Sequence, residues 1–340
     1  MRRIVFTMAA LCLLAAAPTA AAKASWAKPQ IKAVVKQGLM ARTPRAFRPN
    51  DLLTRGELAE IVGALTSIPP VVEDPTALVT VSELDAELVR ALGLGPAADL
   101  VQAQVATAGL APPARLGTET VARVLGLRAS HEGPDEALEL GPDDPVTRAE
   151  TAYSVARALA LTDGDRAWID ELAGTLIPPP LSDWQRAVLS RAVQLVGYPY
   201  VWGGSSELEQ GFPGQPLPGG FDCSGFIWRV YKLEPYESAP YLAEMIRGRS
   251  TYDMSAEVTR KQRVTKRDLQ PGDIVFFGSR GKRSKPAEIG HVGIYFGSGW
   301  LVHASRLGTT LSPLTDWYDT NYAWARRPSP SSTATAPAGM

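Results

Sequence analysis

Cys223 is the side chain of this sequence best placed to act as a nucleophile. It follows a Gly219-Gly220 loop signal and Asp222, a residue type that caps helix N-termini. Apolar residues then recur with helical spacing as far as Tyr231, which predicts that the cysteine lies in the first turn of a helix. The unpaired N–H groups of a first turn favour the thiolate and can hold an oxyanion. The alternative is a cysteine that packs as a small apolar side chain.

Two histidines could supply the base that such a nucleophile needs. His291 and His303 lie in apolar runs that flank the Gly-Ser-Gly sequence at residues 297–299, and this order predicts a β-hairpin. If those three residues form the loop, both imidazoles project from one face of neighbouring strands. One ring can then take the thiol proton while the other orients it. A two-residue loop would place the rings on opposite faces. His131 falls outside this pattern and is expected at the surface.

The same cysteine and histidines could instead hold zinc. Structural zinc sites usually have four ligands, and no carboxylate or second cysteine has a ligand-like spacing here. We therefore expect an acyl-transfer site that needs no metal and no organic cofactor.

The first residues are typical of an export signal. Arg2 and Arg3 precede an apolar run at residues 4–17, and small residues follow, so residues 1–22 are predicted to be a signal peptide. An uncleaved anchor is the alternative, but the run is shorter than the roughly 20 residues of a membrane span. Cys12 would leave with this segment, and Cys223 would remain the only thiol. A lone thiol in an exported protein is inert and buried, an intermolecular bridge, or reactive.

Charge and length narrow the class of protein further. The chain has 35 lysines and arginines against 35 aspartates and glutamates, so no basic surplus argues for a nucleic-acid partner. No segment after the signal is long and apolar enough to span a membrane. A length of 340 residues suggests about two domains.

An internal repeat occupies the N-terminal half. Residues 47–59 reappear as 140–152, with proline, aspartate, threonine, arginine and glutamate in register. In each copy a threonine stands three residues before a glutamate, which is a capping box at a helix start. A degenerate middle copy without the Thr-Arg pair is expected within residues 101–125. The alternative is a helical spacer in which the boxes only cap helices.

This pattern resembles the S-layer homology repeat, a helical module usually found in three copies. The resemblance covers residues 28–162 and implies an all-α domain that binds cell-wall polysaccharide. Residues 163–182, which include three consecutive prolines, are expected to be a linker. Residues 327–340 are rich in proline, serine, threonine and alanine, and a disordered tail is expected there.

Residues 183–308 resemble the NlpC/P60 family of papain-like cysteine peptidases, and the predicted catalytic domain spans 183–326. The matching motifs stand in the family's order and spacing: GYPYVWGG at 197–204, FDCSGF at 221–226, LQPGDIVFF at 269–277, GHVGIY at 290–295 and VHA at 302–304. The resemblance implies an α+β fold, with an antiparallel sheet, flanking helices and the cysteine at a helix N-terminus. It also implies a catalytic triad of Cys223, His291 and His303.

The resemblance further implies a substrate-binding set. Tyr200 would line the site beside the cysteine. Asp222 and Ser224 match positions that help hold the amino end of a wall stem peptide. Arg249, in an Arg-Ser-Thr segment that resembles the family's own, would contribute to the same subsite.

These expectations describe a secreted cysteine peptidase of the cell wall or periplasm that hydrolyses peptidoglycan stem peptides. The resemblance implies cleavage between the γ-carboxyl of D-glutamate and a diamino acid. Three rival functions stay open: an N-acetylmuramoyl-L-alanine amidase-type hydrolase, a transacylase on the same scaffold, and a non-catalytic wall-binding protein in which the repeats bind polysaccharide.

Overall fold

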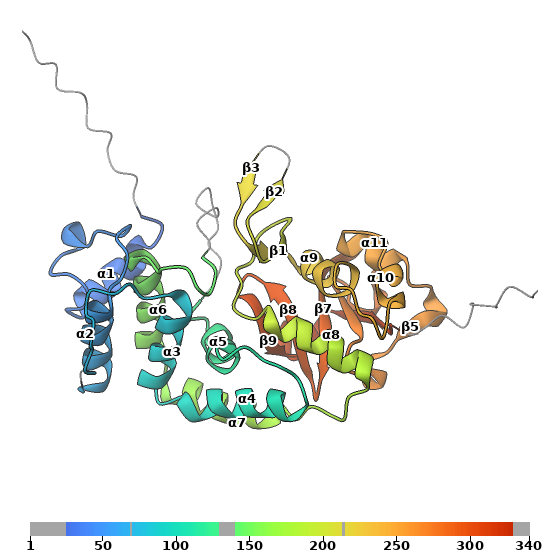
Figure 1. Ribbon diagram of the computed structural model, residues 1–340, viewed down its shortest axis with the longest axis horizontal. Helices are drawn as coiled ribbons and strands as arrows, with labels where there is room; N and C mark the ends of the chain where they lie inside the picture. Colours follow the sequence, from blue (N-terminus) through green and yellow to red (C-terminus); the bar gives the residue numbers. More distant parts are fainter. Residues whose placement is uncertain (1–24, 69, 129–139, 213–214, 329–340) are drawn as a thin grey trace, which may run out of the picture.

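The computed structural model describes residues 25–68, 70–128, 140–212 and 215–328, so the predicted signal peptide, His131 and nearly all of the predicted tail lie outside the described residues. Figure 1 shows a helical part, coloured blue to green, beside a part built on a β-sheet, coloured yellow to red. We call the described residues between 28 and 161 the repeat region, and residues 183–328 the sheet domain. The predicted α+β class is confirmed.

Three of the six α-helices of the repeat region begin at a capping threonine. The six are α1 (Lys28–Lys36), α2 (Arg55–Thr66), α3 (Val81–Ala91), α4 (Gly95–Thr107), α5 (Leu116–Val124) and α6 (Arg148–Ala160). In α2, α3 and α6 a threonine N-cap accepts a hydrogen bond from the backbone N–H three residues later. The cap satisfies one of the donors that a helix start leaves unpaired. These caps belong to Thr54, Thr80 and Thr147.

The segments that lead into the three caps meet in a closed ring of hydrogen bonds. Leu53 N donates to Val146 O at 2.9 Å, Val146 N to Val79 O at 2.9 Å, and Val79 N to Leu53 O at 3.0 Å. All three side chains are fully buried, at 0% exposure. The repeat region is therefore built from three quasi-equivalent segments around a common apolar centre.

The middle copy consequently has its cap at Thr80, and the prediction that it lies within residues 101–125 was wrong. Thr80 and Glu83 form a complete capping box, but Val81 stands where the other copies have arginine. A search for the Thr-Arg pair misses this copy, because the cap itself needs only the threonine and the glutamate. Residues 101–125 contain instead the second half of α4, a connecting segment and α5.

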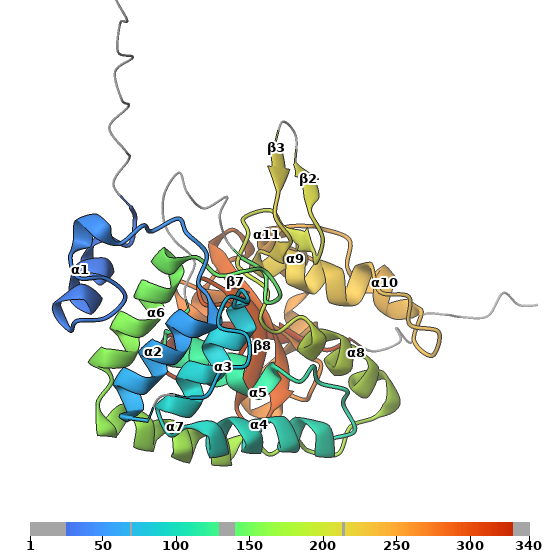
Figure 2. The same cartoon turned by 60° about the vertical axis from the view of Figure 1, so that its left-hand side comes forward.

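The linker is shorter than predicted. Helix α7 (Asp163–Thr175) fills the first part of the expected span, and it starts at a capping box of Thr162 and Asp165. Figure 2 shows α7 side by side with α4. Only residues 176–182, which include the three prolines, connect α7 to the sheet domain without helix or strand.

The sheet domain contains a six-stranded antiparallel sheet in the order β5-β10-β6-β7-β8-β9. The strands are β5 (Arg263–Val264), β6 (Ile274–Gly278), β7 (Ile289–Gly297), β8 (Trp300–Ser305), β9 (Gly308–Pro313) and β10 (Tyr322–Arg326). The domain's α-helices are α8 (Asp183–Gln194), α9 (Cys223–Ile227), α10 (Tyr241–Met245), α11 (Thr251–Ala256) and α12 (Asp316–Thr320). Two short hairpins precede α9, formed by β1 (Ser205–Ser206) with β4 (Gly220–Phe221) and by β2 (Gln210–Phe212) with β3 (Gln215–Leu217).

The two parts of the molecule share one apolar core. A continuous cluster of buried side chains runs from the repeat region, through Leu116 and Val121 of α5, to Leu311 of β9. Helix α5 packs directly on β9. No helix within the described residues is both long enough and apolar enough to cross a membrane.

Candidate active site

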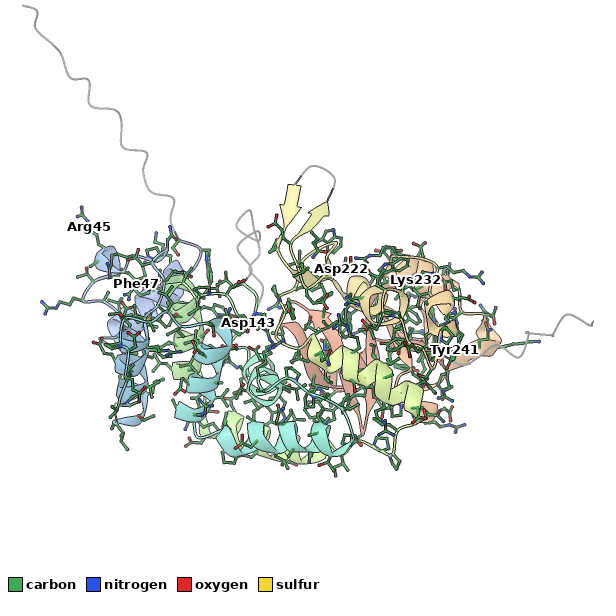
Figure 3. The ribbon with its side chains drawn as sticks, in the orientation of Figure 1. Arg45, Phe47, Asp143, Asp222, Lys232 and Tyr241 are labelled. Carbon is green, nitrogen blue, oxygen red and sulfur yellow. The ribbon has the colours of Figure 1, made fainter. Side chains whose placement is uncertain are left out.

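Cys223 is the first residue of α9, as the sequence predicts. The Asp222 carboxylate caps this helix by accepting from Gly225 N at 2.5 Å. Figure 3 labels Asp222 at the start of α9, next to the hairpin formed by β1 and β4. A five-residue α-helix continues into a π-helical turn at Trp228–Lys232, and α9 packs on β7 and β8. The helix that begins with Cys223 therefore lies against the strands that carry both histidines.

The surroundings of Cys223 favour the neutral thiol. Cys223 is only 8% exposed. Burial, and then the negative charge of Asp222, raise the pKa of the thiol to about 12. The backbone N–H of Val292, the residue after His291, favours the thiolate and opposes this rise in pKa.

His291 on β7 and His303 on β8 project from the same face of the sheet. The register pairs Ile294 with Val302, and a Cβ added at Gly293 would lie 3.0 Å from the Cβ of His303. The hairpin turn contains only Ser298 and Gly299, both with positive φ, so the predicted three-residue loop was wrong. An irregularity between Tyr295 and Gly297 adds the missing residue to the strand, and this bulge keeps the two rings on one face.

The two imidazoles are in hydrogen-bonding contact. His291 Nε2 lies 3.0 Å from His303 Nδ1, which leaves Nδ1 of His291 available for another partner. Burial lowers the pKa of His291 to about 4, and burial together with the neighbouring His291 lowers the pKa of His303 further. Both rings are therefore neutral at pH 7, and a neutral imidazole can accept a proton.

Three aromatic rings that the sequence analysis missed surround the histidine pair. The ring centroids of Phe277 and Trp317 lie 5.7 and 6.2 Å from that of His291, and the centroid of Tyr318 lies 4.9 Å from that of His303. Trp317 is 51% exposed, so it borders the site from the solvent side. The adjacent Trp-Tyr pair was the available signal, but only the return of α12 over the sheet brings it to the histidines.

Asp222, Ser224 and Arg249 form one polar cluster at the start of α9. The Arg249 guanidinium donates to Ser224 Oγ at 2.8 Å and to Asp222 Oδ1 at 3.2 Å. It also donates to the carbonyl oxygens of Gly203 and Gly204, each at 3.1 Å. The cluster thus connects the start of the cysteine helix to the glycine pair of the first motif.

Tyr200 lies close to this cluster. Its backbone pairs with Phe221, two residues before the cysteine. Burial raises the pKa of the Tyr200 hydroxyl, and the nearby charges of Cys223 and Asp222 raise it further. The sheet domain therefore contains all seven residues named from the sequence, with Tyr200, Asp222, Ser224 and Arg249 around the start of the cysteine helix and the histidines on the adjoining strands.

Comparison with known families identifies the sheet domain. The sequence profile of the NlpC/P60 family matches residues 197–327, a span that contains every residue of this site. The sheet domain is an NlpC/P60 domain. The profile of the S-layer homology domain matches residues 20–59, which include α1 and the first cap of the repeat region.

Relatives of this NlpC/P60 domain include named peptidases. A gamma-D-glutamyl-L-lysine dipeptidyl-peptidase of Bacillus cereus is 28% identical over 218 residues, covering 57% of this chain and 55% of that protein. The murein DD-endopeptidase MepH of Escherichia coli is 32% identical over 164 residues, covering 46% and 51%. The chain thus spans about half the length of these relatives. A crystal structure of an NlpC/P60 family protein from Bacillus cereus aligns with a TM-score of 0.32 at 26% identity, over 44% of this chain and 40% of that one.

Proposed function

We propose that this chain is a cysteine peptidase that hydrolyses peptidoglycan stem peptides, with Cys223 as nucleophile, His291 as base and His303 as the residue that orients His291. One observation carries the proposal. Cys223 stands at the start of α9, and this helix packs on β7, the strand of His291. The Nε2 atom of His291 lies 3.0 Å from Nδ1 of His303. A nucleophile, a base and a group that orients the base are the parts that acyl transfer needs.

The contact between the histidines determines the proton positions that the mechanism requires. If His291 carries its proton on Nε2 and donates it to His303 Nδ1, then His291 Nδ1 is free to accept the thiol proton. His303 then carries its own proton on Nε2, a buried atom that has no hydrogen-bond partner among the described residues. This arrangement holds His291 in the tautomer that a general base needs.

The reaction then follows the steps of thiol-dependent amide hydrolysis. His291 takes the proton of Cys223, and the sulfur attacks the amide carbonyl. Backbone N–H groups at the start of α9 stabilise the oxyanion, a contribution of about 3–4 kcal/mol per donor. His291 next protonates the leaving amine, which departs and leaves a thioester. Water, deprotonated by His291, hydrolyses the thioester, releases the acid and restores the thiol.

In this scheme Cys223 and His291 are both uncharged before substrate binds. Burial raises the pKa of Cys223 to about 12 and lowers that of His291 to about 4, so the proton stays on sulfur at neutral pH. The thiolate therefore forms only as substrate is engaged, when the developing negative charge meets the donors of the helix start.

We further propose that the bond cleaved joins the γ-carboxyl of D-glutamate to a diamino acid. The name of the Bacillus cereus relative, a gamma-D-glutamyl-L-lysine dipeptidyl-peptidase, supports this bond. The Asp222 carboxylate could bind the ammonium group of a free stem-peptide amino end, with Ser224 and Arg249 holding that carboxylate in place. Tyr200 would line the same subsite.

The setting proposed for this reaction is the cell wall or periplasm of the producing bacterium, after removal of the signal peptide. The S-layer homology match supports attachment of the repeat region to wall polysaccharide. Retention of the purified protein by peptide-stripped wall glycan, measured by co-sedimentation, would support this attachment, and its absence from the pellet would contradict it.

The decisive experiment is digestion of defined muropeptides by the wild-type protein and a Cys223→Ala variant, followed by mass spectrometry of the products. We expect wild type to release the γ-D-glutamyl fragment and the variant to release none. Hydrolysis by the variant would overturn the cysteine mechanism. Cleavage between sugar and peptide, or at another peptide bond, would overturn the proposed bond, and new amide products formed with added amines would indicate a transacylase.

A further inference from the structure

Helix α5 of the repeat region contacts the NlpC/P60 domain through a buried arginine. Arg123, in the last turn of α5, donates from its terminal nitrogens to the carbonyl oxygens of Gly197 and Leu307, both at 2.5 Å. Its third nitrogen, Nε, donates to Glu119 Oε2 at 2.8 Å. The side chains of Arg123 and Glu119 are only 4% and 0% exposed. The buried guanidinium of Arg123 therefore binds two backbone carbonyl groups that lie far apart in the sequence of the neighbouring domain.

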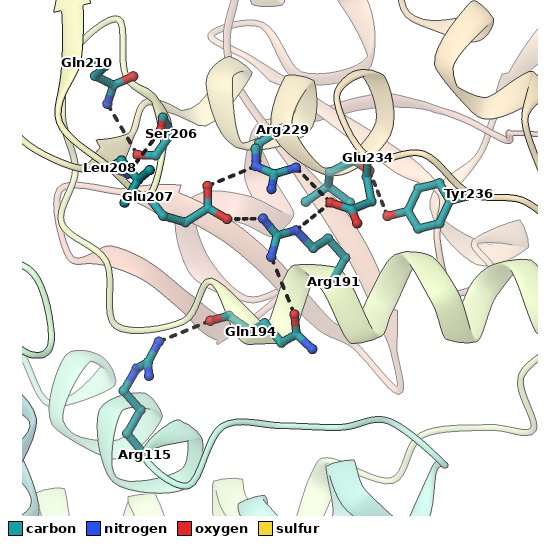
Figure 4. A network of polar contacts seen from close by, with 11 residues as sticks. Arg115, Arg191, Gln194, Ser206, Glu207, Leu208, Gln210, Arg229, Glu234 and Tyr236 are labelled. Carbon is teal, nitrogen blue, oxygen red and sulfur yellow. Dashed lines mark hydrogen bonds and ion pairs between the residues drawn. The ribbon is translucent and has the colours of Figure 1, made fainter.

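A second arginine strengthens the same contact. Arg115, at the N-terminus of α5, donates to Val196 O at 3.0 Å and to Gln194 O at 3.2 Å. Figure 4 shows Arg115 reaching from α5 to Gln194, which follows Arg191 in the last turn of α8. The two arginines together contact the chain segment that leads into the first NlpC/P60 motif.

The backbone of the NlpC/P60 domain leaves room for these guanidinium groups. Gly308 has a φ of +82°, and a Cβ added there would lie 2.1 Å from Arg123 Nη1. Gly197 has a φ of +102°, and its added Cβ would lie 2.9 Å from Arg115 Nε. Glycine permits both the left-handed backbone and the close approach of the arginine. The surface of the NlpC/P60 domain is thus shaped to receive α5.

One of the two carbonyl groups that Arg123 holds lies in the turn after His303, and the other opens a segment that pairs with the strand before Cys223. Gly197 opens the segment that hydrogen-bonds to Phe221, two residues before Cys223, since Phe221 N donates to Pro199 O at 3.1 Å. Leu307 lies in the turn that follows His303 at the end of β8. Arg123 therefore joins the cysteine side of the site to the histidine side.

Backbone hydrogen bonds make this connection continuous. Gly197 N donates to Thr309 O at 3.0 Å, and Thr309 N donates to Tyr198 O at 2.8 Å. Thr309 follows the β8–β9 turn, and Tyr198 precedes Tyr200 by two residues. A shift at Arg123 would therefore be transmitted to both segments through backbone groups rather than through mobile side chains.

We infer that Arg123 is a positioning residue for the Cys223–His291–His303 site, and that the repeat region is a working part of the enzyme rather than a separable wall anchor. The inference rests on the proposed function of this site. Lysine cannot replace the arginine, because a single ammonium nitrogen cannot present two parallel donors to two carbonyl groups in the fixed geometry of a guanidinium.

The chain offers a matched control for testing this role. Arg148 is also buried, at 3% exposure, and also uses all its donor nitrogens, but its partners Glu57, Met40 O and Phe47 O all lie within the repeat region. Arg148→Lys and Arg123→Lys thus remove equivalent contacts at two places. Only the contacts of Arg123 reach the NlpC/P60 domain.

In the full chain we expect Arg123→Lys to lower kcat for a defined muropeptide about 10- to 100-fold with little change in KM, because small displacements of reacting groups have effects of this size. Arg148→Lys should leave kcat unchanged. A kcat of Arg123→Lys within twofold of wild type, or an equal loss in both variants, would overturn the inference.

A second measurement needs no substrate. The rate at which iodoacetamide alkylates Cys223, followed by mass spectrometry across pH, reports the pKa of the thiol, which its burial and neighbouring groups at the start of α9 determine. We expect Arg123→Lys to move the midpoint of this profile toward the ordinary thiol value of about 8.5, and Arg148→Lys to leave it in place. A profile identical to that of wild type in Arg123→Lys would contradict the positioning role, whether or not wild type cleaves any muropeptide. Absence of hydrolysis by wild type with a shifted profile in Arg123→Lys would reject the proposed function alone.

A further variant separates positioning from loss of folding. The double variant E119Q/R123M removes both charges of this buried pair together, so neither Glu119 nor Arg123 leaves an ion without its partner. At a temperature where circular dichroism shows it folded, we expect the same loss of kcat as in Arg123→Lys. A folded double variant with wild-type kcat would overturn the inference.

Discussion

The repeat region and the NlpC/P60 domain place their important side chains in different ways. In the repeat region the same local device occurs three times, and each threonine cap meets its partner only three residues along the chain. In the NlpC/P60 domain Cys223, His291 and His303 come from separate elements, and only the packing of α9 on the sheet and the register of β7 and β8 bring these elements together. When one cap is lost, two similar caps remain in the repeat region. The proposed site has no second copy of Cys223, His291 or His303 among the described residues. Substitutions of the caps should therefore act mainly on stability, and substitutions at the proposed site mainly on activity.

The largest effect should come from His291. His291→Gln removes the proposed base and should lower kcat about 10³-fold, within the range that general-base catalysis contributes. The thermal midpoint should stay near that of wild type, because no buried ion loses its partner. Initial rates on a defined muropeptide, together with a melting curve, measure both quantities. A loss of less than tenfold would mean that another group takes the thiol proton.

His303 should show a smaller effect that depends on the substituent. His303→Leu removes the acceptor for His291 Nε2–H and should lower kcat about 10²-fold. His303→Asn keeps an acceptor oxygen and should retain most of the activity. Equal losses in both variants would indicate that His303 fills space and does not orient His291.

The histidine pair also predicts how stability depends on pH. Both rings have a lower pKa in the folded protein than the ordinary value of about 6.5, so the unfolded chain binds more protons below that pH. The free energy of unfolding should therefore be highest above pH 6.5 and should fall as the pH drops toward 4. Urea unfolding at several pH values measures this trend. A His291→Gln/His303→Gln double variant should lose less stability over the same interval, and an unchanged slope would contradict this assignment.

The smallest effects should come from the caps. Thr54→Ala, Thr80→Ala and Thr147→Ala should each lower the free energy of unfolding by about 1 kcal/mol, the usual cost of losing an N-cap. Muropeptide hydrolysis should be unchanged in all three variants. Urea unfolding of the set tests whether Thr80 is equivalent to the other two, and a negligible effect at Thr80 alone would contradict the placement of the middle copy.

The sequence was most informative where a signal is local or where motifs occur in a recognisable order. The α+β class, the helix start at Cys223 and the common face of His291 and His303 could all be predicted in this way. The length of the hairpin loop could not, because a bulge near Phe296 replaces one loop residue and leaves no pattern in the sequence. The middle copy was missed because Val81 interrupts the expected Thr-Arg pair.

Contacts between segments that lie far apart in the sequence could not be predicted from the residues alone. Arg123 has the spacing of an ordinary helix residue, and nothing near it indicates that Gly197 and Gly308 leave room for its guanidinium. Trp317 and Tyr318 likewise reach the histidines only because α12 returns over the sheet. Such contacts depend on how whole elements pack, and periodicity within one element does not report that packing.

The ring of hydrogen bonds in the repeat region also constrains the order in which the chain can fold during its synthesis. The ring closes between Leu53 and Val146, so the first two segments leave the ribosome long before the third. Before the third segment emerges, the N–H of Leu53 and the carbonyl of Val79 have no partner in the ring. Exposed backbone groups of this kind can pair with another chain. The nascent protein should therefore be most prone to aggregate in the interval before Val146 emerges.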